Sequence, residues 1–292
     1  MTPRLALLGA PWDGSSSFVR GAAGAPPLIR QALWSPSTNT ATEAGVSIEP
    51  AAFDDLGDLS LSDAGSQARA AIEHAVRGIL GSNRVPIALG GDHSITYPVL
   101  RAFGGRPVAT ILHIDAHGDL YDEFPLPAST PAQRLEGAPA PLRPAEPGAQ
   151  PGDRYSHACP FARIMEEGLA RRLVQVGIRT ATPHLKAQAA RFGVEVYDAR
   201  EWRDVPVGAL EGPIYVSLDL DGLDPAFAPG VAHPEPGGLA TRDVVTLLHR
   251  IMAPVAGGDI VEYNPRFDVR DLTARVAAKL LKELMAVAMR NG

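Results

Sequence analysis

Two carboxylates and one imidazole follow an apolar run at a spacing of two residues. The run is Val108 to Leu112, and the three side chains are Asp115, His117 and Asp119. Side chains alternate faces along a β-strand, so these three would leave the same side of the chain. Carboxylates beside an imidazole repel one another and are costly to desolvate, and a bound divalent cation resolves both problems. A metal site is one interpretation, and a solvated strand-to-loop junction is the other.

Two further clusters favour the metal site. Asp219 and Asp221 follow the β-branched segment 213–216, again at a spacing of two residues. A pair of glycines after the apolar run 85–89 lets the backbone turn sharply, which leaves His93 at the same end of its strand. The sequence therefore predicts several polar side chains at strand ends.

An alternation of strands and helices would bring these clusters together. Apolar, β-branched runs predict strands at 5–8, 46–48, 85–89, 108–112, 173–176, 194–197, 214–218 and 259–263. Helical spacing and helix-start residues predict helices at 26–33, 66–80, 95–103, 154–167, 183–191, 241–252 and 271–289. This alternation is typical of a three-layer α/β/α fold with a mostly parallel sheet, here of about eight strands. Ligands in such sheets bind outside the carboxyl ends of the strands.

Size and composition indicate an ordinary globular protein. The chain has 292 residues, 45% of them hydrophobic, so it can bury a large core, and we expect one catalytic domain over residues 1–292. Prolines and alanines crowd the segment at about 125–153, which we interpret as an insertion. The insertion is expected to be mobile, with a lid ordered over the site as the alternative.

Net charge and cysteine content limit the classes of binding partner and the cellular compartment that we expect. A net charge of -6 argues against a nucleic-acid binder, because neutralising phosphates requires a basic face. No apolar run approaches the roughly 20 residues of a membrane-spanning helix. The single cysteine, Cys159, excludes an internal disulfide and fits a reducing compartment, so we expect a soluble cytoplasmic protein. Cys159 could pair with His157 as a nucleophile, but a small buried filler is the alternative.

The number of candidate ligands indicates two ions. One tetrahedral zinc ion cannot use all six of them, and two ions that share bridging carboxylates fit better. Oxygen-rich sets with one imidazole per ion suit Mn²⁺, and Ni²⁺, Co²⁺ and Fe²⁺ stay open. Two such ions about 3.5–4 Å apart lower the pKa of a shared water toward ~7, which predicts metal-assisted hydrolysis. The candidate ligands are His93, Asp115, His117, Asp119, Asp219 and Asp221.

Three motifs in this order resemble the ureohydrolases, the family of arginases, agmatinases and their relatives. They are Gly90-Gly91-Asp92-His93-Ser94, Asp115-Ala116-His117-Gly118-Asp119, and the run from Ser217 to Pro225. Three more segments look most like the branch with plant arginases and many bacterial agmatinases, namely 155–158, 161–168 and 262–265. The resemblance covers nearly the whole chain outside the proline-rich segment.

The resemblance implies how the ligands divide between two manganese ions. One ion would be held by His93, Asp115, Asp119 and Asp219, and the other by Asp115, His117, Asp219 and Asp221. Asp115 and Asp219 would then bridge the pair. The family also implies a small cationic guanidino substrate and a homotrimer or homohexamer.

The resemblance also implies catalytic roles. Asp119 would hold the attacking hydroxide, and Glu262 would pair with the guanidinium. His157 would transfer protons near the leaving amine, with a plain helix-start residue as the alternative. His113 and Asp224 are expected to lie outside the ligand set, as supporting residues.

Two departures from the family pattern lie near the site. Gly118 stands where proline is common in the nearest branch, which would loosen the backbone beside a ligand. Ala232-His233-Pro234 stands where many relatives have Gly-Thr-Pro, so we expect His233 to contact the substrate or a water.

The substrate is the least determined feature. No pattern of Asn and Ser that would grip an α-carboxylate follows Asp119, so we place agmatine, hydrolysed to putrescine, ahead of arginine. The alternatives are arginase, guanidinobutyrase and formimidoylglutamase activity. A metal-binding paralogue without catalysis is also considered, and the presence of both His157 and Glu262 argues against it.

Overall fold

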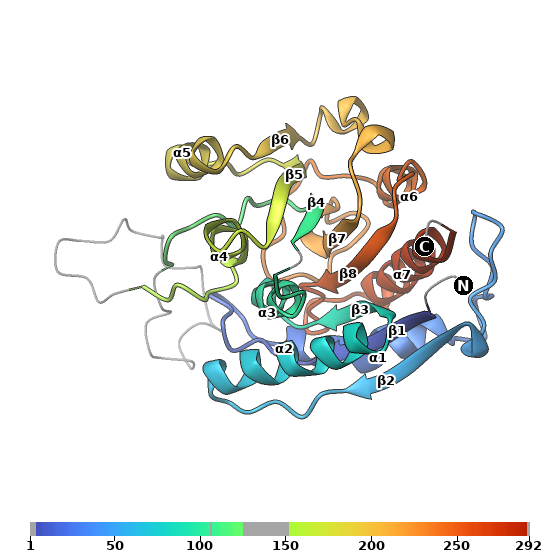
Figure 1. Cartoon of the computed structure of the whole chain (residues 1–292). Coiled ribbons are helices and arrows are strands. Elements are labelled where there is room, and N and C mark those ends of the chain that lie inside the picture. Colours follow the sequence, from blue (N-terminus) through green and yellow to red (C-terminus); the bar gives the residue numbers. More distant parts are fainter. Residues whose placement is uncertain (1–3, 106, 125–151, 291–292) are drawn as a thin grey trace.

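A computed structural model of the chain describes residues 4–105, 107–124 and 152–290 (Figure 1). The strands are β1 Arg4–Ala10, β2 Phe53–Asp58, β3 Arg84–Gly90, β4 Val108–Ile114, β5 Ala170–Ile178, β6 Glu195–Asp198, β7 Ile214–Asp219 and β8 Val255–Val261. The helices are α1 Ala25–Leu33, α2 Gly65–Gly81, α3 Thr96–Arg101, α4 Pro160–Glu166, α5 Pro183–Phe192, α6 Thr241–His249 and α7 Leu272–Arg290. Among the described residues, no helix is both long and apolar enough to span a membrane.

The eight strands form one sheet in the order β2-β1-β3-β8-β7-β4-β5-β6. Every neighbouring pair is parallel, so the carboxyl ends of all strands lie at the same edge. The four central strands β3, β8, β7 and β4 are neighbours although they are far apart in the sequence. The polar motifs that follow them therefore meet at one place.

Alternation along the strands divides the core into two layers. Leu5 and Leu7 of β1 belong to a cluster with α1, α6 and α7 on one face of the sheet. Ala6 and Leu8 point to the other face, into a cluster with α2, α3, α4 and α5. Figure 1 shows the sheet running through the molecule between these two sets of helices. The prediction of a three-layer α/β/α fold with about eight parallel strands is confirmed.

Several of our predictions differ from the described structure or fall outside it. The helix expected at 154–167 begins only at Pro160, and the strand expected at 259–263 is Val255–Val261. The strand expected at 46–48 is wrong, since these residues form only an isolated bridge between Ala41 and Ser47. The strand at this edge of the sheet is β2, whose acidic sequence carries little strand signal because Asp and Gly are depleted in strands. The proline-rich segment predicted at 125–153 lies outside the described residues, apart from its last two.

Close packing of α7 on β8 predicts a position that tolerates no side chain. A Cβ on Gly258 would lie 2.7 Å from the Val216 carbonyl oxygen and 3.0 Å from Leu284 Cδ2. We expect Gly258→Ala to lower the free energy of unfolding by about 1–3 kcal/mol because the core is overpacked. Gly78→Ala, inside α2 where an added Cβ would meet open space, should raise it by about 0.5–1 kcal/mol. Urea denaturation measures both, and equal stability of Gly258→Ala and wild type would contradict the packing argument.

Candidate metal centre

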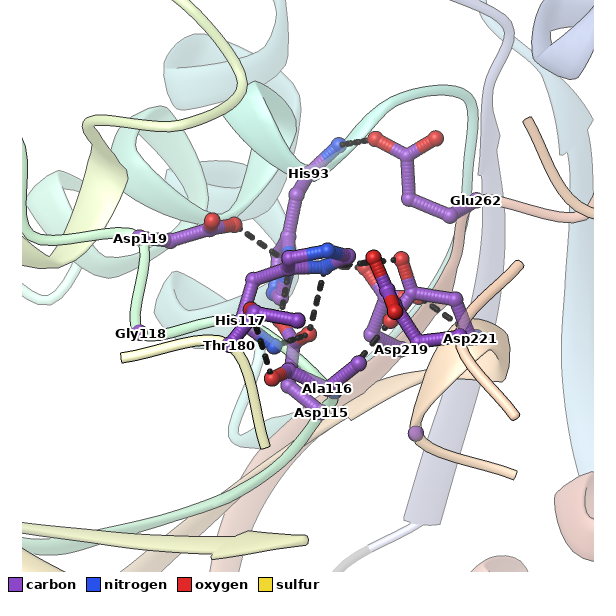
Figure 2. A network of polar contacts seen from close by, with 12 residues as sticks. His93, Asp115, Ala116, His117, Gly118, Asp119, Thr180, Asp219, Asp221 and Glu262 are labelled. Atoms are coloured by element: carbon purple, nitrogen blue, oxygen red, sulfur yellow. Dashed lines mark hydrogen bonds and ion pairs between the residues drawn. The ribbon is translucent and has the colours of Figure 1, made fainter. Parts of the chain in front are cut away.

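All six predicted metal ligands lie together at the carboxyl edge of the central strands (Figure 2). His93 lies in the turn that follows β3, and Asp219 is the last residue of β7. Asp115 follows β4 directly and is fully buried, as is His93. Glu262 follows β8, so each of the four central strands contributes at least one residue.

The His93 ring meets three carboxylates at once. Its Nδ1 lies 3.0 Å from Asp219 Oδ2, 3.1 Å from Asp119 Oδ2 and 3.2 Å from Asp115 Oδ2. This buried nitrogen makes no hydrogen bond of acceptable geometry within the described part of the chain. A proton on Nδ1 could serve only one of the three oxygens, whereas a cation would attract all of them. The residues therefore fit a metal ion.

A second imidazole lies on the other side of Asp115. His117 Nδ1 is 3.1 Å from Asp221 Oδ2 and 3.5 Å from Asp115 Oδ1. The two oxygens of Asp115 thus face different histidines, Oδ2 toward His93 and Oδ1 toward His117. This is the arrangement that a bridging carboxylate between two ions would need.

The electrostatics of the cluster also favour cations. Burial raises the pKa of Asp219 well above its usual range, and the charges of Asp221 and Asp115 raise it further. Burial likewise raises the pKa of Asp221. Charged carboxylates this close would repel one another in a desolvated site, so bound divalent cations would stabilise their ionised forms.

A buried chain of hydrogen bonds orients the His93 ring from behind. His93 Nε2 is 2.9 Å from Ser217 Oγ, which donates to Asp259 Oδ1 at 2.7 Å. Two more hydroxyls, from Thr96 and Tyr215, donate to Asp259 Oδ2. Because the Asp259 carboxylate accepts from Ser217, the serine oxygen is left to accept from His93 Nε2–H. The lone pair of Nδ1 therefore faces the carboxylate cluster, as a metal ligand requires.

His157 and Glu262 form an ion pair beside this cluster. His157 Nδ1 is 3.0 Å from Glu262 Oε1, and His157 Nε2 is 2.8 Å from Ser17 Oγ. Burial alone would lower the pKa of His157, but the Glu262 carboxylate outweighs burial and raises it to about 9. The pairing with His157 lowers the pKa of Glu262 against the opposing effect of burial. His157 thus holds a proton at neutral pH.

Two of the site residues have unusual backbone conformations. Asp119 has a φ of 47° and Glu262 a φ of 64°, in the left-handed region that few non-glycine residues adopt. The Glu262 amide donates to the Gly91 carbonyl at 2.9 Å, and its side chain accepts from the His93 amide at 3.0 Å. Such strain persists where surrounding contacts fix it, and it is concentrated at functional sites.

A cavity of about 300 Å³ opens over the cluster. The predicted ligands His117, Asp119, Asp219 and Asp221 lie at its base, next to His157 and Glu262. Its walls come mainly from the connections between strands, namely Ser17, Tyr121, Phe124, Thr180, Thr182, Leu185, His233 and Glu235. The cavity is large enough for a small molecule whose reactive end reaches the base.

His233 lies inside this cavity, as the sequence predicts. Its ring is 5.1 Å from the His157 ring and 6.2 Å from the His117 ring. Burial lowers the pKa of His233 to about 4, and the neighbouring His157 adds to this effect, so the imidazole is neutral near pH 7.

The contacts of three other residues indicate supporting roles rather than metal binding or catalysis. Asp224 accepts N–H groups of Ala226, Gly237 and Gly238, so it holds a loop. His113 donates toward Asp115 from below the cluster at 2.7 Å. Cys159 is fully buried, and burial raises the pKa of its thiol, which fits a packing role better than a nucleophile.

Several residues that support the site were not identified from the sequence. Asp92 lies within a quoted motif, yet its carboxylate turns out to accept from the Ser15 amide at 3.0 Å and from the Ser94 amide at 3.1 Å. Ser17 and Asp259 carry no local signal beyond being polar. The one sequence signal for Asp259 is that it is a carboxylate inside an otherwise apolar strand.

Known proteins resemble the chain over almost its full length. A model described as the arginase family matches residues 3–287. The chain is 44% identical to arginase 1, mitochondrial, of Arabidopsis thaliana over 299 residues, which cover 96% of this chain and 80% of that protein. The solved arginase from Medicago truncatula has a TM-score of 0.85 at 40% identity, covering 98% of this chain and 88% of that one. The agmatine ureohydrolase of Thermoplasma volcanium has a TM-score of 0.77 at 28% identity, covering 98% and 90%.

These comparisons correct two predictions. The prediction of agmatine ahead of arginine is wrong, because plant proteins named arginase are 40–44% identical to this chain and the agmatine ureohydrolase of Thermoplasma volcanium is only 28% identical. The absence of an Asn and Ser pattern after Asp119 is therefore not a criterion for ranking agmatine above arginine. A cytoplasmic location is contradicted as well, since the Arabidopsis relative is named as mitochondrial. The resemblance to ureohydrolases itself is confirmed.

The His157–Glu262 pair predicts a pH-dependent contribution to stability. With a pKa raised from 6.5 to about 9, His157 contributes fully below pH 6.5, and the contribution is lost as pH rises through 9. We expect His157→Asn to lower the free energy of unfolding by up to about 3 kcal/mol below pH 6.5 and by much less above pH 9. Chemical denaturation across this range measures the difference.

The matched control for this series is His74→Asn, which changes an exposed histidine of α2. Its free energy of unfolding should follow that of wild type over the same pH range. A His157→Asn effect that does not depend on pH would rule out the ion pair as its source.

Proposed function

Because this chain belongs to the arginase family, whose members hydrolyse guanidino groups, we propose that it is an arginase that converts arginine to ornithine and urea. The observation that carries the choice is the identity of 44% with an arginase over 96% of the chain. We include in the proposal one catalytic domain over residues 1–292 and assembly as a homotrimer or homohexamer, which light scattering would measure.

Two divalent cations, manganese in this proposal, would be held by the six residues that meet at the strand ends. His93 Nδ1, with its three surrounding carboxylates, would belong to the first site. His117 Nδ1, with Asp221 and Asp115, would belong to the second. When bound, such a pair lowers the pKa of a shared water and so supplies hydroxide near neutral pH.

Protein groups would bind and orient the substrate around this centre. The Glu262 carboxylate is almost fully buried, so it would attract the guanidinium strongly in a medium of low dielectric. The cavity would seat the rest of arginine between its loop-derived walls. Asp119, held in its left-handed conformation at the base of the cavity, would orient the attacking water.

Proton transfer would fall to His157. Its raised pKa of about 9 keeps a proton on the ring, and the ring lies at the cavity base beside Glu262. A group poised near the operating pH can donate that proton to the departing amine. Neutral His233, whose ring lies 5.1 Å from the His157 ring, would accept hydrogen bonds from the guanidinium without repelling it.

A substrate panel tests the proposal. We expect purified protein with Mn²⁺ to release urea and ornithine from L-arginine with a higher kcat/KM than from agmatine or guanidinobutyrate. Formimidoylglutamate, assayed for formamide, is the control for a different bond. Faster turnover of any of these three compounds would overturn the assignment of arginine.

Substitution of Asp119 separates catalysis from mere metal binding. Asp119→Asn should lower kcat on arginine by about 10²–10⁴-fold, because the side chain that orients the attacking group is lost. Asp122→Asn, at a partly exposed residue three positions further on, is the matched control and should keep activity near that of wild type. If Asp119→Asn changed the melting temperature but not kcat, a structural metal site would be the better reading.

A further inference from the structure

Four buried polar side chains lie in register across neighbouring strands. Two of them, His113 and Ser217, come two residues before the proposed ligands Asp115 and Asp219. Gln175 of β5 is paired with His113 of β4, which is paired with Ser217 of β7, which is paired with Asp259 of β8. None of the four is more than 1% exposed. Ser217 and Asp259 orient His93, as described above, whereas His113 contacts a different proposed ligand, Asp115, and Gln175 contacts His113.

Gln175 makes two contacts through one amide nitrogen. Its Nε2 is 2.6 Å from the Gly118 carbonyl oxygen and 3.1 Å from His113 Nδ1. A side-chain NH₂ group has two hydrogens, so both contacts are donated simultaneously. The reverse orientation would bring the Gln175 carbonyl oxygen against the Gly118 carbonyl oxygen, which excludes it.

This amide determines the tautomer of His113. Nδ1 accepts from Gln175, so the hydrogen of the neutral ring is on Nε2. His113 Nε2 is 2.7 Å from Asp115 Oδ2, and it therefore donates to that oxygen. The Phe161 ring, 4.0 Å from the His113 ring between centroids, packs against the imidazole and holds it in this place.

We propose that Gln175 is a positioning residue for the metal centre, an inference that rests on the metal-dependent function proposed above. Through His113 it orients Asp115, the carboxylate that faces both His93 and His117. Through the Gly118 carbonyl it holds the loop between His117 and Asp119. One buried amide thus fixes ligands on both sides of the centre.

The tautomer is tested first, on the full-length metal-free protein. ¹⁵N NMR of histidine-labelled wild type should show His113 with a hydrogen on Nε2 and none on Nδ1, with His113→Gln identifying the signal. In Gln175→Glu the ionised carboxylate accepts rather than donates, so the hydrogen should move to Nδ1, and the contact with the Gly118 carbonyl oxygen becomes repulsive. A hydrogen on Nδ1 in wild type overturns the proposal, whether or not any variant folds.

Metal affinity is tested next with Mn²⁺ as the probe. Gln175→Glu and Gln175→Met should weaken Mn²⁺ binding by about 10–100-fold, the usual effect of losing a group that orients a ligand. Gln188→Met is the matched control, because Gln188 is also buried and donates to a carbonyl of the same loop, that of Leu120, at 3.1 Å. This control should lose comparable stability and keep its Mn²⁺ affinity.

A double-mutant cycle asks whether Gln175 acts through His113. His113→Gln carries its own donor to Asp115 whatever its neighbour, so Gln175→Glu should cost clearly less Mn²⁺ affinity in that background. An undiminished cost, or equal losses of affinity in Gln175→Met and Gln188→Met, would refute the positioning role. These readouts need no substrate, so their failure is distinguishable from failure of the arginase assignment.

Discussion

Repulsion among four buried aspartates is the physical constraint on which the rest of this site depends. Asp115 and Asp219 lie within about 3 Å of the His93 ring nitrogen, and Asp221 is as close to His117. Folding brings these groups together only because the strands that carry them pair in the centre of the sheet. The packing of the two core layers therefore offsets an electrostatic cost at the sheet edge, and bound cations would remove most of that cost.

Beside the charged cluster, the four paired side chains Gln175, His113, Ser217 and Asp259 restrict the conformations of the proposed ligands. Asp259 gathers three hydroxyl donors, and the one from Ser217 fixes the hydrogen on His93. Gln175 has the corresponding role for Asp115, because it donates to His113, which in turn donates to Asp115. Such fully satisfied buried networks are rigid, because every alternative rotamer would leave a donor or acceptor without a partner.

The sequence was sufficient to predict that the proposed ligands meet at one edge of the sheet, because local spacing rules mark each of them. Asp115, His117 and Asp119 recur at a spacing of two, and the glycine pair marks the turn before His93. The strand alternation that we assumed for the first three does not hold, because β4 ends at Ile114 and Asp119 has a φ of 47°. Gln175 and Asp259 obey no such rule, since their partners are set by strand register, which depends on the whole sheet. The edge strand 53–58 was missed because its acidic residues carry little strand propensity. The substrate prediction was wrong because it relied on the one segment after Asp119, whereas the cavity is lined by residues from several connections.

The walls of the cavity and its base have different origins, and this separates two kinds of evolutionary change. The base is built on strand ends that the core holds in place, whereas the walls, such as Thr180 and Glu235, belong to connections that the core does not fix. Mutations in the connections can therefore reshape the space for the far end of a guanidino compound while the reacting centre keeps its geometry. A fold organised in this way can acquire a new substrate by small steps without passing through an inactive ancestor.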